Sequence, residues 1–266
     1  MQTLALGLVS GALVGLVLAS IGGGGSILAV PMLIYLVGVS SPHVAIGTSS
    51  VAVAASAAIN LGLHARHGTV KWRCATVFAL AGAMGAWIGS TFGKATDGQS
   101  LLALFGAVMI VVGLLMLRRR GEGDNPEVRL DLKSVAHFAP RLILTGFGAG
   151  LASGYFGIGG GFLIVPALIL ATHMPMIAAI GSSLFAVTVF GATTAVSYSR
   201  SGLVDWPLAG AFIAAGLFGG SLGSRLATVL ARRRSVLTAV FGVLVIGVGV
   251  YMVSRGLPLL IRRIRV

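Results

Sequence analysis

Long apolar stretches separated by short polar segments dominate this sequence. Their bounds are 4–38, 43–65, 74–93, 98–117, 142–172, 174–199, 206–224 and 235–254. Several of them reach the roughly 20 residues that a helix needs to cross a bilayer. They are rich in Leu, Ala, Gly and Val and lack a strict alternation of apolar and polar positions, which favours helices over a β-barrel. The pattern therefore predicts an all-α polytopic membrane protein.

Composition and charge agree with a membrane environment. Hydrophobic residues make up 56% of the chain and charged residues 9%, and the mean hydropathy of +1.01 lies outside the range of soluble domains. The net charge of +13 comes from basic residues that cluster between the apolar stretches, where such residues set membrane orientation. We therefore expect the lipid bilayer as a partner and no nucleic acid.

The second half of the sequence repeats the first at a nearly constant offset. The matching pairs are Ile21–Pro31 with Phe156–Pro166, Ala45–Ser49 with Ala179–Ser183, and Arg66–Trp72 with Arg200–Trp206. Many matches in the same order indicate an internal duplication. The predicted organisation is a first transmembrane repeat at 1–118, a linker at 119–138 and a second transmembrane repeat at 139–266.

The number of predicted crossings decides how the two repeats face each other. Each repeat is expected to hold a glycine-broken hairpin, either re-entrant or built of half-helices, followed by three transmembrane helices. The number of crossings is then odd, so the second repeat has the inverted topology. The positive-inside rule places the N-terminus outside and the 119–138 linker in the cytoplasm. Arg262 and Arg263 of the C-terminal tail fall outside in this topology, against the rule.

The glycine tracts break both repeats at equivalent places. A helix from Ser26 to Gly38 would span only about 20 Å, short of a hydrocarbon core of about 30 Å. Each tract is therefore expected at membrane depth, where backbone freed from a helix must line a cavity. Broken helices at matching positions of inverted repeats indicate the binding site of a transporter. For the series Gly7, Gly11, Gly15 and Gly85, Gly89, Gly93, close packing of helices is the favoured interpretation.

The polar groups in the predicted spans suit an anion. All six acidic residues lie in loops or at a span edge, which argues against a cation carrier that uses a membrane carboxylate. Backbone N–H groups and hydroxyls remain, and these bind oxyanions, although hydroxyls in membrane helices also bond back to their own helix. The candidate binding residues are Gly22, Gly23, Gly24, Gly25, Ser26, Thr48, Ser49, Asn60, Gly159, Gly160, Gly161, Ser182, Ser183 and Thr194.

Arg66 and Arg200 occupy equivalent positions of the two repeats. Inversion would place one at each mouth of the protein. They are either interfacial anchors, the favoured interpretation, or the cations of two vestibules that concentrate anions.

These motifs resemble the TauE/SafE family of sulfite exporters over essentially the whole chain. The resemblance rests on the glycine tract followed by Val-Pro in both halves, the Gly-Thr-Ser and Gly-Ser-Ser motifs, and Gly-x-Val-x-Trp at Gly68 and Gly202. It implies a bacterial inner-membrane permease that moves sulfite or organosulfonates outward, with the glycine tracts and hydroxyl pairs as its binding residues. Phe162 stands where the first half has Ser26, so the two half-sites are not equivalent.

The resulting hypothesis is a secondary transporter that exports small sulfur-containing anions by alternating access around a midplane site. An anion channel, or a permease for another small oxyanion or carboxylate, is the alternative. No enzyme motif occurs, so we expect no catalytic residues, no cofactor and no metal. A homodimer is left open beside a monomer.

Overall fold

The computed structural model describes residues 2–21, 23–66, 68–118, 132–174, 176–230 and 242–255, and the described residues contain helices and no strand. The elements are α1 (Gln2–Ile21), η1 (Gly23–Leu28), α2 (Ala29–Pro31), η2 (Met32–Leu36), α3 (Pro42–Arg66), α4 (Trp72–Ala95), α5 (Gly98–Arg118), α6 (Leu132–Phe156), α7 (Gly161–Thr172), α8 (Met176–Arg200), α9 (Trp206–Leu230) and a C-terminal helix at Gly242–Arg255. Gly22, most of the predicted linker, the Arg232–Arg234 loop and the C-terminal tail lie outside the described residues.

Four helices in the described part of the chain are long and apolar enough to cross a membrane. These are α3, α4, Gly98–Leu115 of α5 and Ala178–Arg200 of α8. Shorter apolar segments occupy α1, α7, α9, the residues from Ser26 to Leu36 and the C-terminal helix. The prediction of an all-helical, multi-pass membrane protein is confirmed.

The chain leaves α-helical geometry at both glycine tracts. After α1, residues of η1 form a 3-10 helix, and residues of η2 form a π-helix in which the Val37 N–H donates to Met32 O at 3.0 Å. The segment from Ser26 to Leu36 is therefore a short apolar helix, as predicted, but its geometry is not that of a regular α-helix. Pro31 supplies no N–H at the junction, and the chain after it widens to the π pattern. In the second half, α7 is a continuous α-helix of 12 residues.

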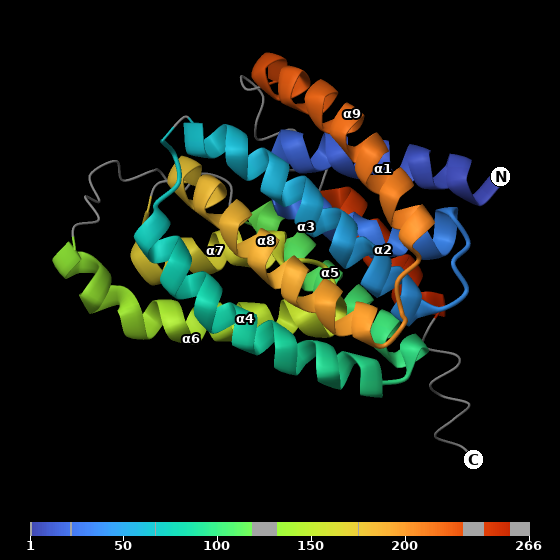
Figure 1. Ribbon diagram of the computed structural model, residues 1–266, viewed down its shortest axis with the longest axis horizontal. Coiled ribbons are helices and arrows are strands. Elements are labelled where there is room, and N and C mark those ends of the chain that lie inside the picture. The colour runs from blue at the N-terminus through green and yellow to red at the C-terminus, as the bar shows by residue number, and fades with distance from the viewer. Residues whose placement is uncertain are drawn as a thin grey trace.

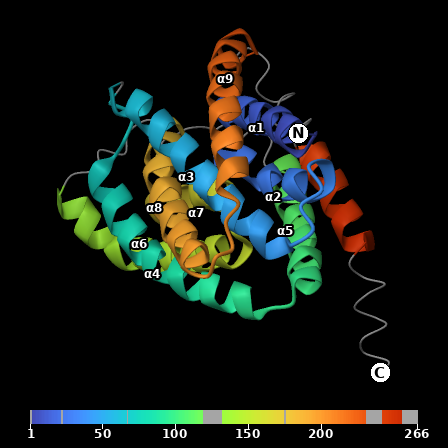
Figure 2. The same ribbon diagram turned by 45° about the vertical axis from the view of Figure 1, so that its right-hand side comes forward.

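The helices of one half pair with those of the other in a reciprocal way (Figure 1). α1 packs along α9 and α6 packs along α4, while α3 packs on α8 and η1 on α7. In Figure 2 the C-terminal helix, in red, runs beside α5. Exchanging every element with its sequence counterpart leaves this set of pairs unchanged, which agrees with a duplicated architecture.

Glycine seams bring the paired helices into backbone contact. A Cβ added at Gly15 of α1 would lie 2.7 Å from the Cα of Gly216 in α9. At the equivalent Gly150 of α6, the added Cβ would lie 2.6 Å from the Cα of Gly82 in α4. Substituted Gly11, Gly85, Gly89 and Gly93 would likewise meet backbone of the facing helix, and Gly7 would meet the side chain of Leu208. The packing interpretation of these series is confirmed.

Candidate functional site

Three glycines form the turn that joins α6 to α7. Gly157, Gly159 and Gly160 have φ angles of 66, 65 and 68°, the left-handed region that glycine adopts without steric cost. There is also no room for side chains. A Cβ at Gly159 would lie 2.6 Å from Cγ1 of Val53 on α3, and one at Gly160 would lie 2.8 Å from Cβ of Ser153. Both conformation and packing therefore require glycine at this break.

Backbone donors are left free where α7 begins. The N–H groups of Leu163 and Ile164 both donate to Gly160 O, each at 2.9 Å. Among the backbone hydrogen bonds of the described residues, none is donated by Gly159, Gly160 or Gly161, and all three are buried. Gly160 caps α7 without a side-chain hydrogen bond. The positive end of the α7 dipole and its unused N–H groups thus lie inside the protein.

Ser153 of α6 points its hydroxyl at this helix end. Its Oγ would lie 2.9 Å from a Cβ added at Gly160. The residue is fully buried, and its Oγ has no hydrogen-bond partner among the described residues. An unpaired buried hydroxyl costs stability, which a bound hydrogen-bond acceptor would recover. Ser153 is not among the residues predicted from the sequence, because its counterpart in the first half is Leu18 and the repeat gives no signal there.

Two serines of α3 hold the turn from the other side. Ser50 Oγ donates to Ile46 O at 2.8 Å and to Gly157 O at 3.0 Å. Ser49 Oγ donates to the same two carbonyls at 2.9 and 3.3 Å. These hydroxyls position the break through the Gly157 carbonyl. Of the predicted hydroxyl residues, Ser49 therefore lies next to the second glycine tract.

Thr48 of α3 and Ser182 of α8 each contact a loop of the opposite repeat. The N–H of Asp205 donates to Thr48 Oγ1 at 3.0 Å, and the N–H of Lys71 donates to Ser182 Oγ at 2.9 Å. The two contacts are equivalent under the repeat. In each, the hydroxyl accepts the N–H of a loop from the opposite half. The structure does not bring these two predicted residues together with the glycine turn.

The remaining predicted residues are dispersed. Asn60 Nδ2 donates to Ser56 O at 3.0 Å, and Ser183 Oγ bonds back to Ile180 O at 2.7 Å. Thr194 is buried, and its Oγ1 has no partner in the described structure. In the first tract, Gly23, Gly24, Gly25 and the buried Ser26 belong to η1, which packs against α7.

The two predicted vestibule arginines lie at the ends of their helices. Arg66 is exposed at the end of α3. Arg200 is exposed at the end of α8, with its guanidinium 5.5 Å from the ring centre of Trp87. A cation over an aromatic ring is an arrangement typical of an anchor at a membrane interface.

The interior around the glycine turn carries no formal charge in the sequence. Residues 2–42, 44–63, 142–172 and 174–199 contain no Asp, Glu, Lys, Arg or His. These ranges include η1, α7 and the central parts of α3, α6 and α8. Within the described residues, no group of three or more His, Cys, Asp or Glu could hold a metal ion. The donors at the turn are all neutral.

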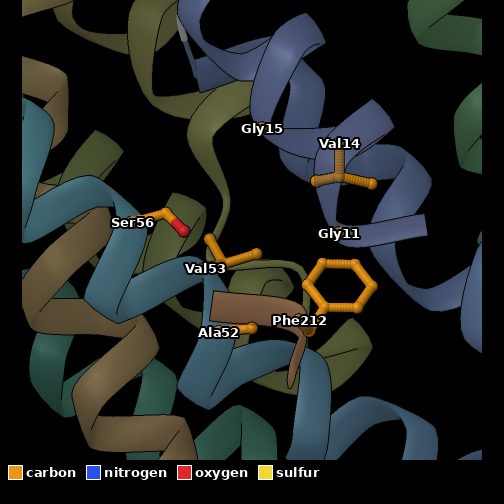
Figure 3. A pocket seen from close by; sticks show the side chains of 7 residues that line it. All are labelled: Gly11, Val14, Gly15, Ala52, Val53, Ser56 and Phe212. Atoms are coloured by element: carbon orange, nitrogen blue, oxygen red, sulfur yellow. The ribbon is translucent and has the colours of Figure 1, made fainter. Parts of the chain in front are cut away.

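A small cavity lies beside the turn, between α1, α3 and α9 (Figure 3). Its volume of about 10 Å³ is near the minimum for one water molecule. Its lining is apolar except for Ser56, whose side chain projects from α3 (Figure 3). Val53 of the same helix lines this cavity and also contacts the glycine turn.

The equivalent space in the other half is filled by an aromatic ring. The counterpart of Ser56 is Phe190, which stacks on Phe78 with ring centres 5.9 Å apart. Phe190 is fully buried and covers Gly82, the counterpart of Gly216. The two halves thus share their seams but differ in the side chains next to the break.

Comparison with known proteins gives a consistent family assignment. The family described as "Sulfite exporter TauE/SafE" matches residues 7–252. A probable membrane transporter protein of Xylella fastidiosa is 52% identical over 259 residues, which cover 96% of each chain. The probable membrane transporter protein YunE of Bacillus subtilis is 31% identical over 235 residues, covering 82% of this chain and 86% of the relative. No solved structure matches the chain.

Proposed function

Because the chain belongs to the TauE/SafE family of sulfite exporters, we propose that it is a secondary transporter that exports small sulfur-containing anions across the bacterial inner membrane. The family and its relatives, named as probable membrane transporters, support transport rather than enzymatic chemistry. The substrate class and the outward direction are our inference from the family description and the site.

One observation carries the proposal: the buried, unpaired donors at the glycine turn. The hydroxyl of Ser153 lies beside Gly160 at the N-terminus of α7, and neither this hydroxyl nor the N–H groups of Gly160 and Gly161 donate a hydrogen bond within the described residues. An oxyanion supplies several acceptors at once and is attracted to the positive helix end. The sequence ranges that contain η1, α7 and the central parts of α3, α6 and α8 hold no carboxylate that would repel it.

The reciprocal pairing of the two halves suggests how the substrate moves. Inverted repeats related by an axis in the membrane plane would exchange α1 with α6 and α4 with α9, as the contacts allow. In such transporters one half rocks against the other around a central site. We propose that the glycine breaks at η1 and α7, which pack on each other, form that centre and are exposed to each side in turn.

Thermal stabilisation of the detergent-purified protein tests the site. A ligand at 100 times its dissociation constant adds about 2.7 kcal/mol. Sulfite and methanesulfonate should each raise the Tm, whereas chloride and divalent cations should not. Ser153→Ala should abolish the shift. Ser10→Ala is the matched control. Like Ser153, Ser10 is a fully buried serine whose Oγ has no hydrogen-bond partner in the described structure, but it lies in α1.

Transport measurements separate a carrier from a channel. Proteoliposomes loaded with unlabelled methanesulfonate should accumulate labelled methanesulfonate transiently by counterflow, which a channel does not support. Stabilisation by cations alone, or anion flux without counterflow, would contradict the proposed function.

A further inference from the structure

In the part of the chain that the structure describes, the donors at the glycine turn are neutral, and their neutrality bears on the charge that a ligand can carry. The desolvation cost of an ion in a low-dielectric interior rises with the square of its charge. The attraction of the same ion to fixed dipoles and N–H groups rises only in proportion to its charge. A dianion therefore incurs four times the cost for twice the attraction, whereas a monoanion has the most favourable balance.

The ionisable side chains on the elements packed around the turn are held by other groups or lie at helix ends. On α3, Arg66 is exposed at the end, and on α6, Arg141 is exposed near its start. His173 follows the last residue of α7, about 18 Å along the helix from its beginning. The side chains of the others make the following contacts: His43 with Gly93 O and Thr96 O, His64 with Thr69 Oγ1, Lys94 with Ser197 O and Ser201 Oγ, Tyr155 with Thr96 Oγ1, the Tyr198 ring with Lys94 Nζ, and the Arg200 guanidinium with the Trp87 ring.

We infer that the site at Ser153, Gly160 and Gly161 takes singly charged oxyanions and rejects dianions. This inference rests on the proposed function. Its substrates are sulfonates, which carry one charge at any physiological pH, and the hydrogen form of a diprotic sulfur oxyacid. Ser153 is a binding residue of this site, because its hydroxyl gives one oxygen of the anion a donor beside the N–H groups of α7.

The inference predicts a difference in pH dependence between two substrates of similar shape. Methanesulfonate keeps its single charge throughout, so its transport rate should not change with pH. Sulfite loses its remaining proton as pH rises through the second ionisation of sulfurous acid. Its rate should follow the hydrogensulfite fraction and fall about tenfold for each pH unit above that ionisation. Sulfate, a dianion throughout, should not be transported.

The experiment measures initial uptake of the three anions into proteoliposomes, below and above that ionisation and without a pH gradient. Ser153→Ala should lower methanesulfonate and hydrogensulfite transport by a similar factor of about ten or more, the worth of a hydrogen bond to a charged group. It should leave the pH profile of each substrate unchanged. Ser10→Ala should leave both rates unchanged.

The outcomes distinguish this inference from the function on which it rests. Sulfite transport that is flat with pH, or sulfate transport at a comparable rate, would show a site for dianions and overturn the inference alone. A parallel fall of methanesulfonate and sulfite transport would indicate a titrating protein group and also overturn it. If none of the three anions is transported, the proposed function fails as well.

Discussion

The seam between α4 and α6 allows a sharp test of how the fold is held together. Gly150 and Gly148 lie two residues apart on α6, yet they face different surroundings. A Cβ at Gly150 would lie 2.6 Å from both the Cα and the C of Gly82, while a Cβ at Gly148 would meet nothing within 4 Å. Gly150→Ala should therefore destabilise the protein, and Gly148→Ala should not.

The expected loss of stability follows from the separation of α4 and α6 that the new methyl group requires. The atoms that meet the new methyl group at Gly150 are backbone, so no side-chain rotation relieves the contact. Ordinary contact begins at 3.4 Å, so the two helices must separate by at least 0.8 Å there. Neighbouring contacts at Gly85 and Gly154 would then open, and a gap of about 0.5–1 Å forfeits a quarter to a half of the dispersion energy. We expect a loss near the upper end of the roughly 1–3 kcal/mol typical of overpacking.

Gly148→Ala serves as the matched control for this substitution. The position is exposed and helical, so alanine there should be neutral or add up to about 1 kcal/mol through helix propensity. Thermal unfolding in detergent, followed by size-exclusion chromatography of heated samples, measures both variants. At about 2–4 °C per kcal/mol, Gly150→Ala should melt about 10 °C below Gly148→Ala. Equal melting temperatures would refute the argument that backbone contact limits the approach of these helices.

Three further predictions concern the break, the core and the mouth of the protein. The Gly160→Ala variant should lose the stabilisation by anions. Its control is Gly202→Ala, because Gly202 has a φ of 69° and a Cβ added there would meet nothing within 4 Å. The control should show only the cost of backbone strain, about 1–2 kcal/mol. Phe190→Ala should lower the free energy of unfolding by about 3–5 kcal/mol because it empties a buried position, while Phe218→Ala, which is 75% exposed, should change it little. If Arg200 belongs to a vestibule, Arg200→Gln should weaken anion transport from one side of the membrane more than from the other. Equal effects on both sides in sided flux assays would favour the anchor.

Sequence periodicity was sufficient to predict a helical, multi-pass membrane protein. The same glycine spacing that repeats between halves predicted the seams, because a helix must present one face to a backbone neighbour wherever small residues recur every four positions. Gly15 and Gly150 occupy equivalent places and meet equivalent partners. The irregular helix after the first tract was not predicted, because Pro31 permits several local hydrogen-bond patterns and packing selects among them.

The roles of individual hydroxyls were less accessible to sequence reasoning. Thr48 and Ser182 were predicted as binding residues from their repeated motifs, and in the structure each accepts the N–H of a loop from the other half. That partner lies 157 or 111 residues away, so no local pattern reveals it. Ser153, by contrast, was not predicted from the sequence. Nothing in its neighbourhood marked it, and only the turn at Gly160 brings its hydroxyl to the start of α7.

The departures from symmetry indicate which parts of the duplication serve function. The seam glycines Gly11, Gly15 and Gly85 have glycine counterparts in the other half, and a side chain at either member of each pair would meet backbone of the facing helix. Around the break, Ser153 faces α7 while its counterpart is Leu18, and Ser56 lines a cavity while its counterpart Phe190 fills the equivalent space. A substrate without internal symmetry needs only one set of donors, so a duplicated scaffold is free to specialise one half for binding and the other for packing. On this reasoning we propose that the second glycine turn supplies the donors for the anion, whereas the small cavity at Ser56 lies where the first half packs less completely than the second.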